Sequence, residues 1–249
     1  MELIRVDKTD GLATVVMVRG KVHAFNEAMI DTVASAFGKL RDDPDARVIV
    51  LTGEGSFFSF GLDVPEIYGY SKEDFARFLG KFTALYTDIF AFPKPVIAAI
   101  NGHAIAGGCM LTNACDYRVM VTGKARIALN EVTFGSSIFA GSVEILQALV
   151  GNRNAETVAF TGKMFSAEEA LALGLVDRAV GPEALASAVQ EVAQEYLQRD
   201  LRAYAAIKRL LREPILEQMQ RHERDSIRRF IDLWYSPETR EKLKGIQIR

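Results

Sequence analysis

Short β-branched runs alternate with amphipathic segments in the first half of the chain, and this alternation constrains the fold most strongly. The runs VIVLTG (residues 48–53) and PVIAAI (95–100) have the length and apolar character of buried strands. Apolar residues recur at helical spacing over 26–40 and again over 71–92, so a helix is expected before each run. Such alternation favours an α/β layer fold with a largely parallel sheet.

Turn and capping residues place further elements along the chain. Asp10-Gly11 lies between two strand-like runs, which predicts a hairpin over 3–18. Ser166 followed by Glu169 has the pattern of a capping box at a helix start. The other predicted elements are helices at 109–115 and 182–197, strands at 117–121 and 175–180, and two helices around Pro214 within 201–235.

Composition narrows the class of protein. The 249 residues are 49% hydrophobic and 25% charged, with a formal net charge of −2, which is typical of a globular chain. That charge does not favour nucleic acid as a partner, and no apolar run approaches the roughly 20 residues of a membrane span. The start of the chain lacks the pattern of a signal or transit peptide. Cys109 and Cys115 are too few for a disulfide framework or a zinc site, so we expect one compact, cytoplasmic unit.

Two loops that are poor in side chains follow the two predicted strands. Gly61 precedes Leu62 in the first loop, and Gly107 and Gly108 lie at the predicted first turn of a helix in the second. Ligand sites of α/β folds gather at the carboxyl ends of strands. If the N–H groups of Leu62 and Gly107 converge, they form an oxyanion hole for a carbonyl oxygen that gains charge. The alternative is that these glycines only permit close packing of a helix on a strand.

Four linked motifs in this order resemble the enoyl-CoA hydratase/isomerase (crotonase) superfamily: FSFGLDVPEI, INGHAIAGGC, CDYRVM and ARIALNEVTFG, with GLVD following at 174–177. The resemblance implies a crotonase-type spiral of ββα units over residues 1–195 and a C-terminal helical region over 196–249 that mediates trimers or dimers of trimers. It also implies an acyl-CoA thioester as substrate. No metal or separate cofactor is implied, because coenzyme A is part of the substrate.

The same resemblance assigns roles to individual residues. It makes Leu62 and Gly107 the two donors to the thioester oxygen. The segment His23, Ala24 and Phe25 is expected to run along the coenzyme, with Ser59, Phe60, Gly61 and Gly108 also in contact with substrate. Several relatives carry a lysine where this chain has Pro65, so phosphate contacts must come from elsewhere. The basic residues of the C-terminal third are then either a solvated helix face or a phosphate or subunit contact: Arg199, Arg202, Lys208, Arg209, Arg212, Arg221, Arg224, Arg228 and Arg229.

The acids of the motifs favour one reaction of the family. Hydratases of the family use two glutamates, and the first of these positions is Met110 here, whereas the second is Glu131. A single carboxylate suits proton transfer between two carbons, so the resemblance favours a Δ3,Δ2-enoyl-CoA isomerase in which Glu131 is the base. The alternatives are a hydratase with an unusual second acid, a thioesterase, a decarboxylase, or a non-catalytic acyl-CoA- or RNA-binding member. The alternative interpretation of Glu131 is an ordinary surface glutamate in a loop.

Other residues receive mainly structural interpretations. Glu66 is the best candidate for a second acid, but the role of a glutamate stabilised by the dipole at a helix start is favoured for it. His103 is expected to be structural or to line a tunnel, and Asp63 and Asp116 to accept hydrogen bonds from main-chain N–H groups. Aromatic residues at helical spacing are expected in the core, with some lining an acyl tunnel: Phe75, Phe78, Phe82, Tyr86 and Phe90.

Overall fold

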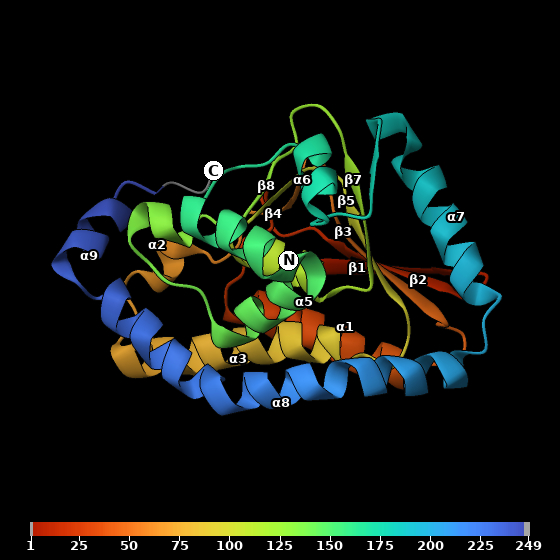
Figure 1. Cartoon of the computed structure of the whole chain (residues 1–249), viewed down its shortest axis with the longest axis horizontal. Coiled ribbons are helices and arrows are strands. Elements are labelled where there is room, and N and C mark those ends of the chain that lie inside the picture. Colours follow the sequence, from red (N-terminus) through yellow and green to blue (C-terminus); the bar gives the residue numbers. More distant parts are fainter. Residues whose placement is uncertain (1, 247–249) are drawn as a thin grey trace.

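Two β-sheets form the centre of the protein in a computed structural model, which describes residues 2–246 (Figure 1). The larger sheet has six strands in the order β1 (Ile4–Thr9), β2 (Leu12–Met17), β3 (Val48–Gly53), β5 (Val96–Ile100), β7 (Tyr117–Val121) and β9 (Arg178–Val180). The smaller sheet has the order β4 (Phe57–Ser59), β6 (His103–Ile105) and β8 (Ile127–Ala128).

Strand directions confirm the predicted hairpin and the largely parallel sheet. β1 and β2 pair in antiparallel fashion, with Thr9 opposite Leu12 across the Asp10-Gly11 turn. The pairs β2–β3, β3–β5, β5–β7 and β7–β9 are all parallel. The smaller sheet is parallel throughout its three described strands.

Consecutive strands are shared between the two sheets in a repeated pattern. β3, β5 and β7 each enter the larger sheet, and the strand that follows each of them enters the smaller one. Helical structure comes next in every case: α2 (Val64–Ile67) and α3 (Lys72–Phe90), α4 (Gly107–Ala114), and η1 (Glu131–Phe134) with α5 (Ala140–Thr161). This succession is the ββα repeat that the sequence motifs predicted.

Helices cover both faces of the larger sheet because its central strands are apolar on both sides. α7 (Leu185–Leu197) covers one face of the larger sheet, where it packs against Val48 and Val50. Ile49 and Leu51 point to the opposite face and join the main core. α1 (Glu27–Asp42) contributes to that core and begins, as predicted, at Asn26, whose side chain accepts a hydrogen bond from Met29 N–H.

The C-terminal region contradicts one prediction. Within residues 201–235 there is one helix, α8 (Leu201–Trp234), with Pro214 inside it, instead of the two predicted helices around Pro214. A proline inside a helix costs about 3 kcal/mol, and packing outweighs that penalty here. α8 runs along α3, as Figure 1 shows, and it also contacts α5. Its later turns bury Met219, Phe230 and Trp234 in the main core.

An ion cluster attaches the first half of α8 to the sheet. Asp116 accepts a hydrogen bond from the main-chain N–H of Val96, as predicted, at 2.7 Å. Its two carboxylate oxygens also pair with Lys208 at 2.7 Å and with Arg212 at 2.8 Å. The solvated-face interpretation is therefore wrong for Lys208, which is 7% exposed, and for the half-buried Arg212. Burial lowers the pKa of Lys208 to about 8 despite the neighbouring carboxylate.

The remaining helices are short and belong to the C-terminal half of the chain. They are α6 (Ala167–Leu173), η2 (Pro182–Ala184) and α9 (Pro237–Leu243). The capping box of Ser166 and Glu169 opens α6 as predicted. None of the helices within residues 2–246 is long and apolar enough to cross a membrane. The division into 1–195 and 196–249 stays a prediction, although helices on both sides of it share the main core.

Candidate active site

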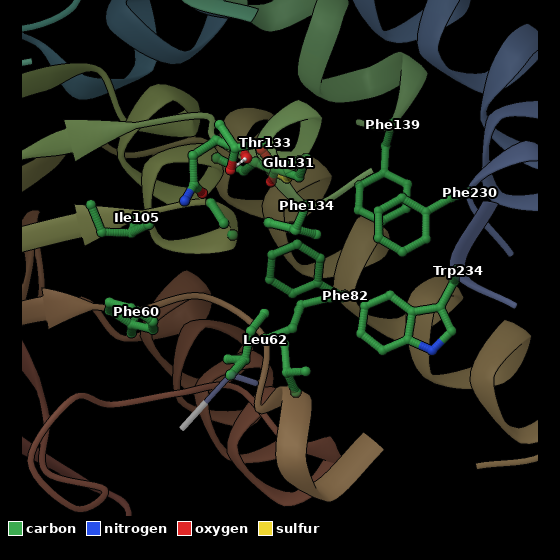
Figure 2. A pocket seen from close by; sticks show the side chains of 16 residues that line it. Phe60, Leu62, Phe82, Ile105, Glu131, Thr133, Phe134, Phe139, Phe230 and Trp234 are labelled. Carbon is green, nitrogen blue, oxygen red and sulfur yellow. Dashed lines mark hydrogen bonds between the residues drawn. The ribbon is translucent and has the colours of Figure 1, made fainter. Parts of the chain in front are cut away.

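A cavity of about 370 Å³ lies where the smaller sheet meets α3, α5 and α8. Figure 2 shows Glu131 at its wall, with the aromatic rings of Phe139, Phe230 and Trp234 gathered on one side. The residues that line it are Phe60, Leu62, Val64, Phe82, Ile105, Ala106, Gly107, Met110, Asn130, Glu131, Thr133, Phe134, Phe139, Phe230, Trp234 and Ile246. The wall is therefore mostly apolar.

Three neighbouring strands deliver the three predicted catalytic residues to this cavity. β4 leads to Leu62, β6 leads to Gly107, and β8 leads to Glu131. The three strands are parallel, with Ala104 opposite Ile127 and Ile105 opposite Ala128. Because the carboxyl ends of parallel strands meet at one edge of a sheet, residues separated by some 70 positions in sequence are brought together.

The two loops that carry the predicted donors touch through their main chains. A methyl group built on Gly61 would lie 2.8 Å from the nitrogen of Gly107 and 2.9 Å from the carbonyl oxygen of Ile105. Gly61 also has a φ of 87°, a conformation that other residues rarely adopt. The absence of a side chain at Gly61 lets the two loops pack closely, and it also leaves their main-chain groups uncovered by a side chain at this position. The close-packing interpretation and the oxyanion-hole interpretation of these loops are therefore compatible.

The N–H groups of Leu62 and Gly107 are both free of main-chain partners within residues 2–246. Phe25 donates to the carbonyl of Gly61 at 2.7 Å and accepts from the N–H of Asp63 at 2.9 Å. In such a parallel bridge, the N–H of Leu62 points away from Phe25. Gly107 opens α4, where a first-turn N–H has no partner inside the helix.

Ala106 supports this arrangement with an unusual backbone conformation. Its φ of 50° and ψ of −117° are strained for a residue with a side chain. The turn is held by a hydrogen bond from Ala106 N–H to the carbonyl of Ala128 at 2.8 Å and by one from Met110 N–H to the carbonyl of Ala106 at 3.0 Å. Strain of this kind concentrates at functional sites, and here it immediately precedes Gly107.

Glu131 is a buried acid and not the surface glutamate of the alternative interpretation. Glu131 is 4% exposed, and its Oε2 has no hydrogen-bond partner among the described residues. Burial raises the pKa of this carboxyl from 4.5 to about 8. A carboxyl with a pKa near neutrality can both accept and return a proton.

Met110 occupies the wall where the first glutamate of a hydratase is expected, and it is 2% exposed. Among the described residues that line the cavity, Glu131 is the one ionisable group. Asn130 and Thr133 are the polar side chains beside it, and Thr133 Oγ1 donates to the main-chain carbonyl of Asn130 at 2.7 Å (Figure 2). The described wall therefore has one acid–base group, and it also includes Leu62 and Gly107, the two residues whose N–H groups are the predicted donors.

The other predicted contact residues divide into one that lines the cavity and several that lie behind it. Phe60 lines the wall. Ser59 is fully buried, and its hydroxyl donates to the carbonyl of His23 at 2.9 Å and accepts from Gly61 N–H at 3.1 Å. A methyl group on Gly108 would lie 2.3 Å from the carbonyl oxygen of Ser59. These residues shape the two loops.

The segment from His23 to Phe25 is buried and largely engaged within the protein. The N–H groups of His23 and Phe25 donate to the carbonyls of Arg19 and Gly61, and the carbonyl of Ala24 accepts from Arg19 at 2.7 Å. Contact of His23, Ala24 and Phe25 with the coenzyme stays a prediction.

Three further candidates do not line the cavity: Glu66, Asp63 and His103. Glu66 is exposed on α2, where it pairs with Arg19 at 3.0 Å and accepts from the Asn26 amide. Asp63 caps the same helix by accepting from Glu66 N–H, as expected. His103 lies against the ring of Phe57, with centroids 4.9 Å apart, which agrees with its structural interpretation.

Sequence reasoning missed much of the cavity wall. Phe82 is one of the aromatic residues that the sequence places at helical spacing, but no sequence pattern discussed above includes Phe139, Phe230, Trp234 or Ile246. Phe230 and Trp234 are four residues apart on α8, so their spacing marked one helix face. Phe139 and Phe230 stack with centroids 4.7 Å apart, which joins α8 to the start of α5.

Comparisons with known proteins identify the family of the chain. The Enoyl-CoA hydratase/isomerase family model matches residues 7–247. A carnitinyl-CoA dehydratase from Salmonella arizonae is 33% identical over 212 residues, which are 85% of this chain and 80% of that protein.

Solved structures show the same fold. The human mitochondrial delta3-delta2-enoyl-CoA isomerase superposes with a TM-score of 0.93 at 23% identity, covering 98% of this chain and 96% of that one. A probable enoyl-CoA hydratase from Mycobacterium tuberculosis superposes with a TM-score of 0.85 at 30% identity, covering 91% and 95%.

These similarities show that the protein is an α/β enzyme with the crotonase fold. The chain belongs to the enoyl-CoA hydratase/isomerase family, so the family and fold that its motifs predicted are confirmed.

Proposed function

We propose that the protein is an isomerase that converts 3-enoyl-CoA to 2-trans-enoyl-CoA. The observation that carries this proposal is a cavity whose described wall has one ionisable side chain, Glu131, and also includes Leu62 and Gly107, whose N–H groups have no main-chain partner among residues 2–246. Moving a double bond requires removal of one proton and return of one proton, with no net addition of water. One carboxyl group is sufficient for both steps.

In the proposed reaction, the thioester carbonyl oxygen accepts hydrogen bonds from Leu62 N–H and Gly107 N–H. The Glu131 carboxylate removes a proton from C2, and the electron pair moves into the conjugated thioester to give a dienolate. The two N–H groups stabilise the negative charge that develops on the oxygen. The Glu131 carboxyl then returns the proton to C4, which leaves the double bond between C2 and C3. All atoms of the substrate are retained, and no separate cofactor is required.

A second candidate is hydration or dehydration of an acyl-CoA, which the similarity to carnitinyl-CoA dehydratase favours. That chemistry must position a water and transfer a proton to or from it. With Met110 in the wall, the cavity offers one carboxyl for this work. A thioesterase or decarboxylase is a further alternative within the family, with no observation of its own in favour.

Parallel assays of 3-enoyl-CoA and crotonyl-CoA distinguish the two candidates. We expect 3-enoyl-CoA to gain the absorbance of a conjugated thioester, and crotonyl-CoA to keep that absorbance. Hydration would require a second proton-transfer group, and loss of one such group typically lowers the rate by about 10²–10⁴-fold. Hydration of crotonyl-CoA at a rate equal to or above isomerisation would overturn the isomerase proposal in favour of a hydratase.

The pH dependence of the reaction is expected to follow the raised pKa of Glu131. The base must be deprotonated, and burial raises its pKa to about 8. We therefore expect kcat/KM to increase as the pH rises through about 8 and to level off above it. A rate profile measured across this range tests the expectation. A profile that is already level at neutral pH would contradict the role of a buried carboxylate.

We further propose a homotrimer or a dimer of such trimers located in the cytoplasm. α8 exposes Ile207, Leu210 and Leu211 to 58%, 72% and 70%, which is an apolar group that subunit contact would cover. The two cysteines are free and buried, as suits a reducing compartment. An acyl-CoA thioester is the proposed partner, and neither nucleic acid nor a membrane is part of the proposal.

A further inference from the structure

The short helix α9 contacts two of the three segments that carry the proposed catalytic groups, those of Glu131 and Leu62. Its residues Thr239 and Arg240 are adjacent in the chain, yet one contacts the segment of Glu131 and the other contacts the segment of Leu62. Figure 1 shows α9 beyond the end of α8 and next to α2. The two contacts are independent of one another and are described in turn.

Thr239 is attached to the turn that begins with Glu131. It is 2% exposed, and its Oγ1 donates to the carbonyl of Gly135 at 2.8 Å. Gly135 ends η1, and the adjacent Ser136 N–H donates back to the carbonyl of Glu131 at 3.0 Å. A methyl group on Gly135, whose φ is 85°, would lie 2.8 Å from Thr239 Oγ1. The glycine is thus what allows α9 to approach this turn.

Arg240 is attached to the segment that follows Leu62. Its guanidinium lies 3.4 Å from the centre of the Tyr68 ring, and it donates to the carbonyl of Tyr68 at 2.7 Å. Tyr68 is the C-cap of α2, which starts two residues after Leu62. Tyr235 reinforces the contact, because its hydroxyl donates to the carbonyl of Tyr70 at 2.6 Å.

The end of the described chain also reaches the cavity itself. Leu243 is 2% exposed in the main core, and Ile246 lines the cavity three residues later. Ile246 N–H donates to the carbonyl of Leu243 at 3.0 Å, which continues the turn beyond α9. The helix is therefore fixed at both ends, and it holds Thr239 and Arg240 in place.

We propose that Thr239 and Arg240 are positioning residues that fix the separation between the Glu131 carboxyl and the N–H of Leu62. This inference rests on the proposed function, because it assigns to α9 the spacing between the base and one oxyanion donor. Both groups must contact the same substrate, one at C2 and one at the thioester oxygen. A displacement of about 1 Å between reacting groups can lower a rate by about 10²-fold. A helix that contacts both loops limits such displacement.

Thr239→Val tests the first contact, because valine keeps the shape of threonine and removes the hydroxyl. We expect kcat for 3-enoyl-CoA to fall about tenfold, with KM within about twofold of the wild-type value. The substrate still enters the cavity, but the Glu131 carboxyl is held less firmly in its position. Thr239→Ser keeps the hydroxyl and should restore kcat. Thr87→Val is the matched control: Thr87 Oγ1 also donates to a carbonyl, that of Thr83 at 2.8 Å, within α3. It should leave kcat unchanged.

Hydrogen exchange gives a readout that does not depend on turnover. In Thr239→Val, amides of residues 131–136 should exchange faster, and in Arg240→Ala, amides of residues 62–70 should do so. The Thr87→Val control should match the wild type in both segments.

If the wild-type protein does not isomerise 3-enoyl-CoA, the proposed function fails, and the exchange rates still decide whether α9 fixes the two loops. Unchanged exchange in both variants would overturn the positioning role. So would a Thr239→Ser variant that is as slow as Thr239→Val.

Discussion

Replacing Glu131 by glutamine is expected to lower kcat for 3-enoyl-CoA isomerisation by about 10²–10⁴-fold, the range typical of losing a general base. Glutamine has nearly the same shape but cannot accept and return a proton. The oxyanion donors are main-chain groups, so they remain in the variant. Binding of a saturated acyl-CoA, measured by calorimetry, should therefore change little while turnover in the absorbance assay is almost lost.

Stability provides an independent check on this variant. The pKa of Glu131 is raised from 4.5 in an ordinary environment to about 8 in the folded protein. The folded state therefore keeps a proton that the unfolded state has lost between these two pH values, and stability falls as the pH rises through this window. Glu131→Gln has no such proton to lose. At pH 8 its melting temperature should equal or exceed that of the wild type.

Glu66→Gln is the matched control for Glu131→Gln. Glu66 is also a glutamate near a site loop, but it is exposed on α2 and does not line the cavity. Its substitution should leave isomerisation within about twofold, as expected for a surface position. Equal turnover in Glu131→Gln and in the wild type would show that another group transfers the proton.

The central part of the fold could be predicted because each element carries its own local signal. The runs 48–53 and 95–100 are β-branched and short, and they became β3 and β5. Asn26 and Ser166 have side chains that suit a helix start, and both cap helices. Such signals depend on neighbours in sequence, so a single chain is sufficient to find them.

α8 could not be predicted in the same way, because its continuity depends on distant contacts. Pro214 is a local signal for a helix break, whereas the helix is held by Asp116 before the proline and by the main core after it. In the sequence, Lys208 is likewise one of many basic residues spread over the C-terminal third, and no neighbouring residue distinguishes it. Its burial follows from Asp116, which is 92 positions away.

The site shows the same division between local and distant information. The motifs identified Leu62, Gly107 and Glu131, and the smaller sheet brings their three loops to one edge. Phe139, Phe230 and Trp234 complete the wall from α5 and α8, and no motif marks them.

Gly61→Ala is expected to have the second large effect, a fall in kcat/KM of about 10²–10³-fold, the range reported for loss of an oxyanion donor. The added methyl group would lie 2.8 Å from the nitrogen of Gly107 and 2.9 Å from the carbonyl oxygen of Ile105. Both contacts are with main chain, so the two loops must move apart. The N–H groups of Leu62 and Gly107 would then no longer converge on one oxygen, as the proposed function requires.

Gly123→Ala separates this effect from the general strain of alanine at positive φ. The φ of Gly123 is 89° and that of Gly61 is 87°, but among the described residues other than its chain neighbours, no heavy atom lies within 4 Å of a methyl group at Gly123. Both variants carry the strain of a left-handed alanine, about 1–2 kcal/mol, and both should melt at lower temperature. Only Gly61→Ala places a methyl group between the loops. If the two variants lose equal activity, strain alone accounts for the loss, and the thioester oxygen does not lie between Leu62 and Gly107.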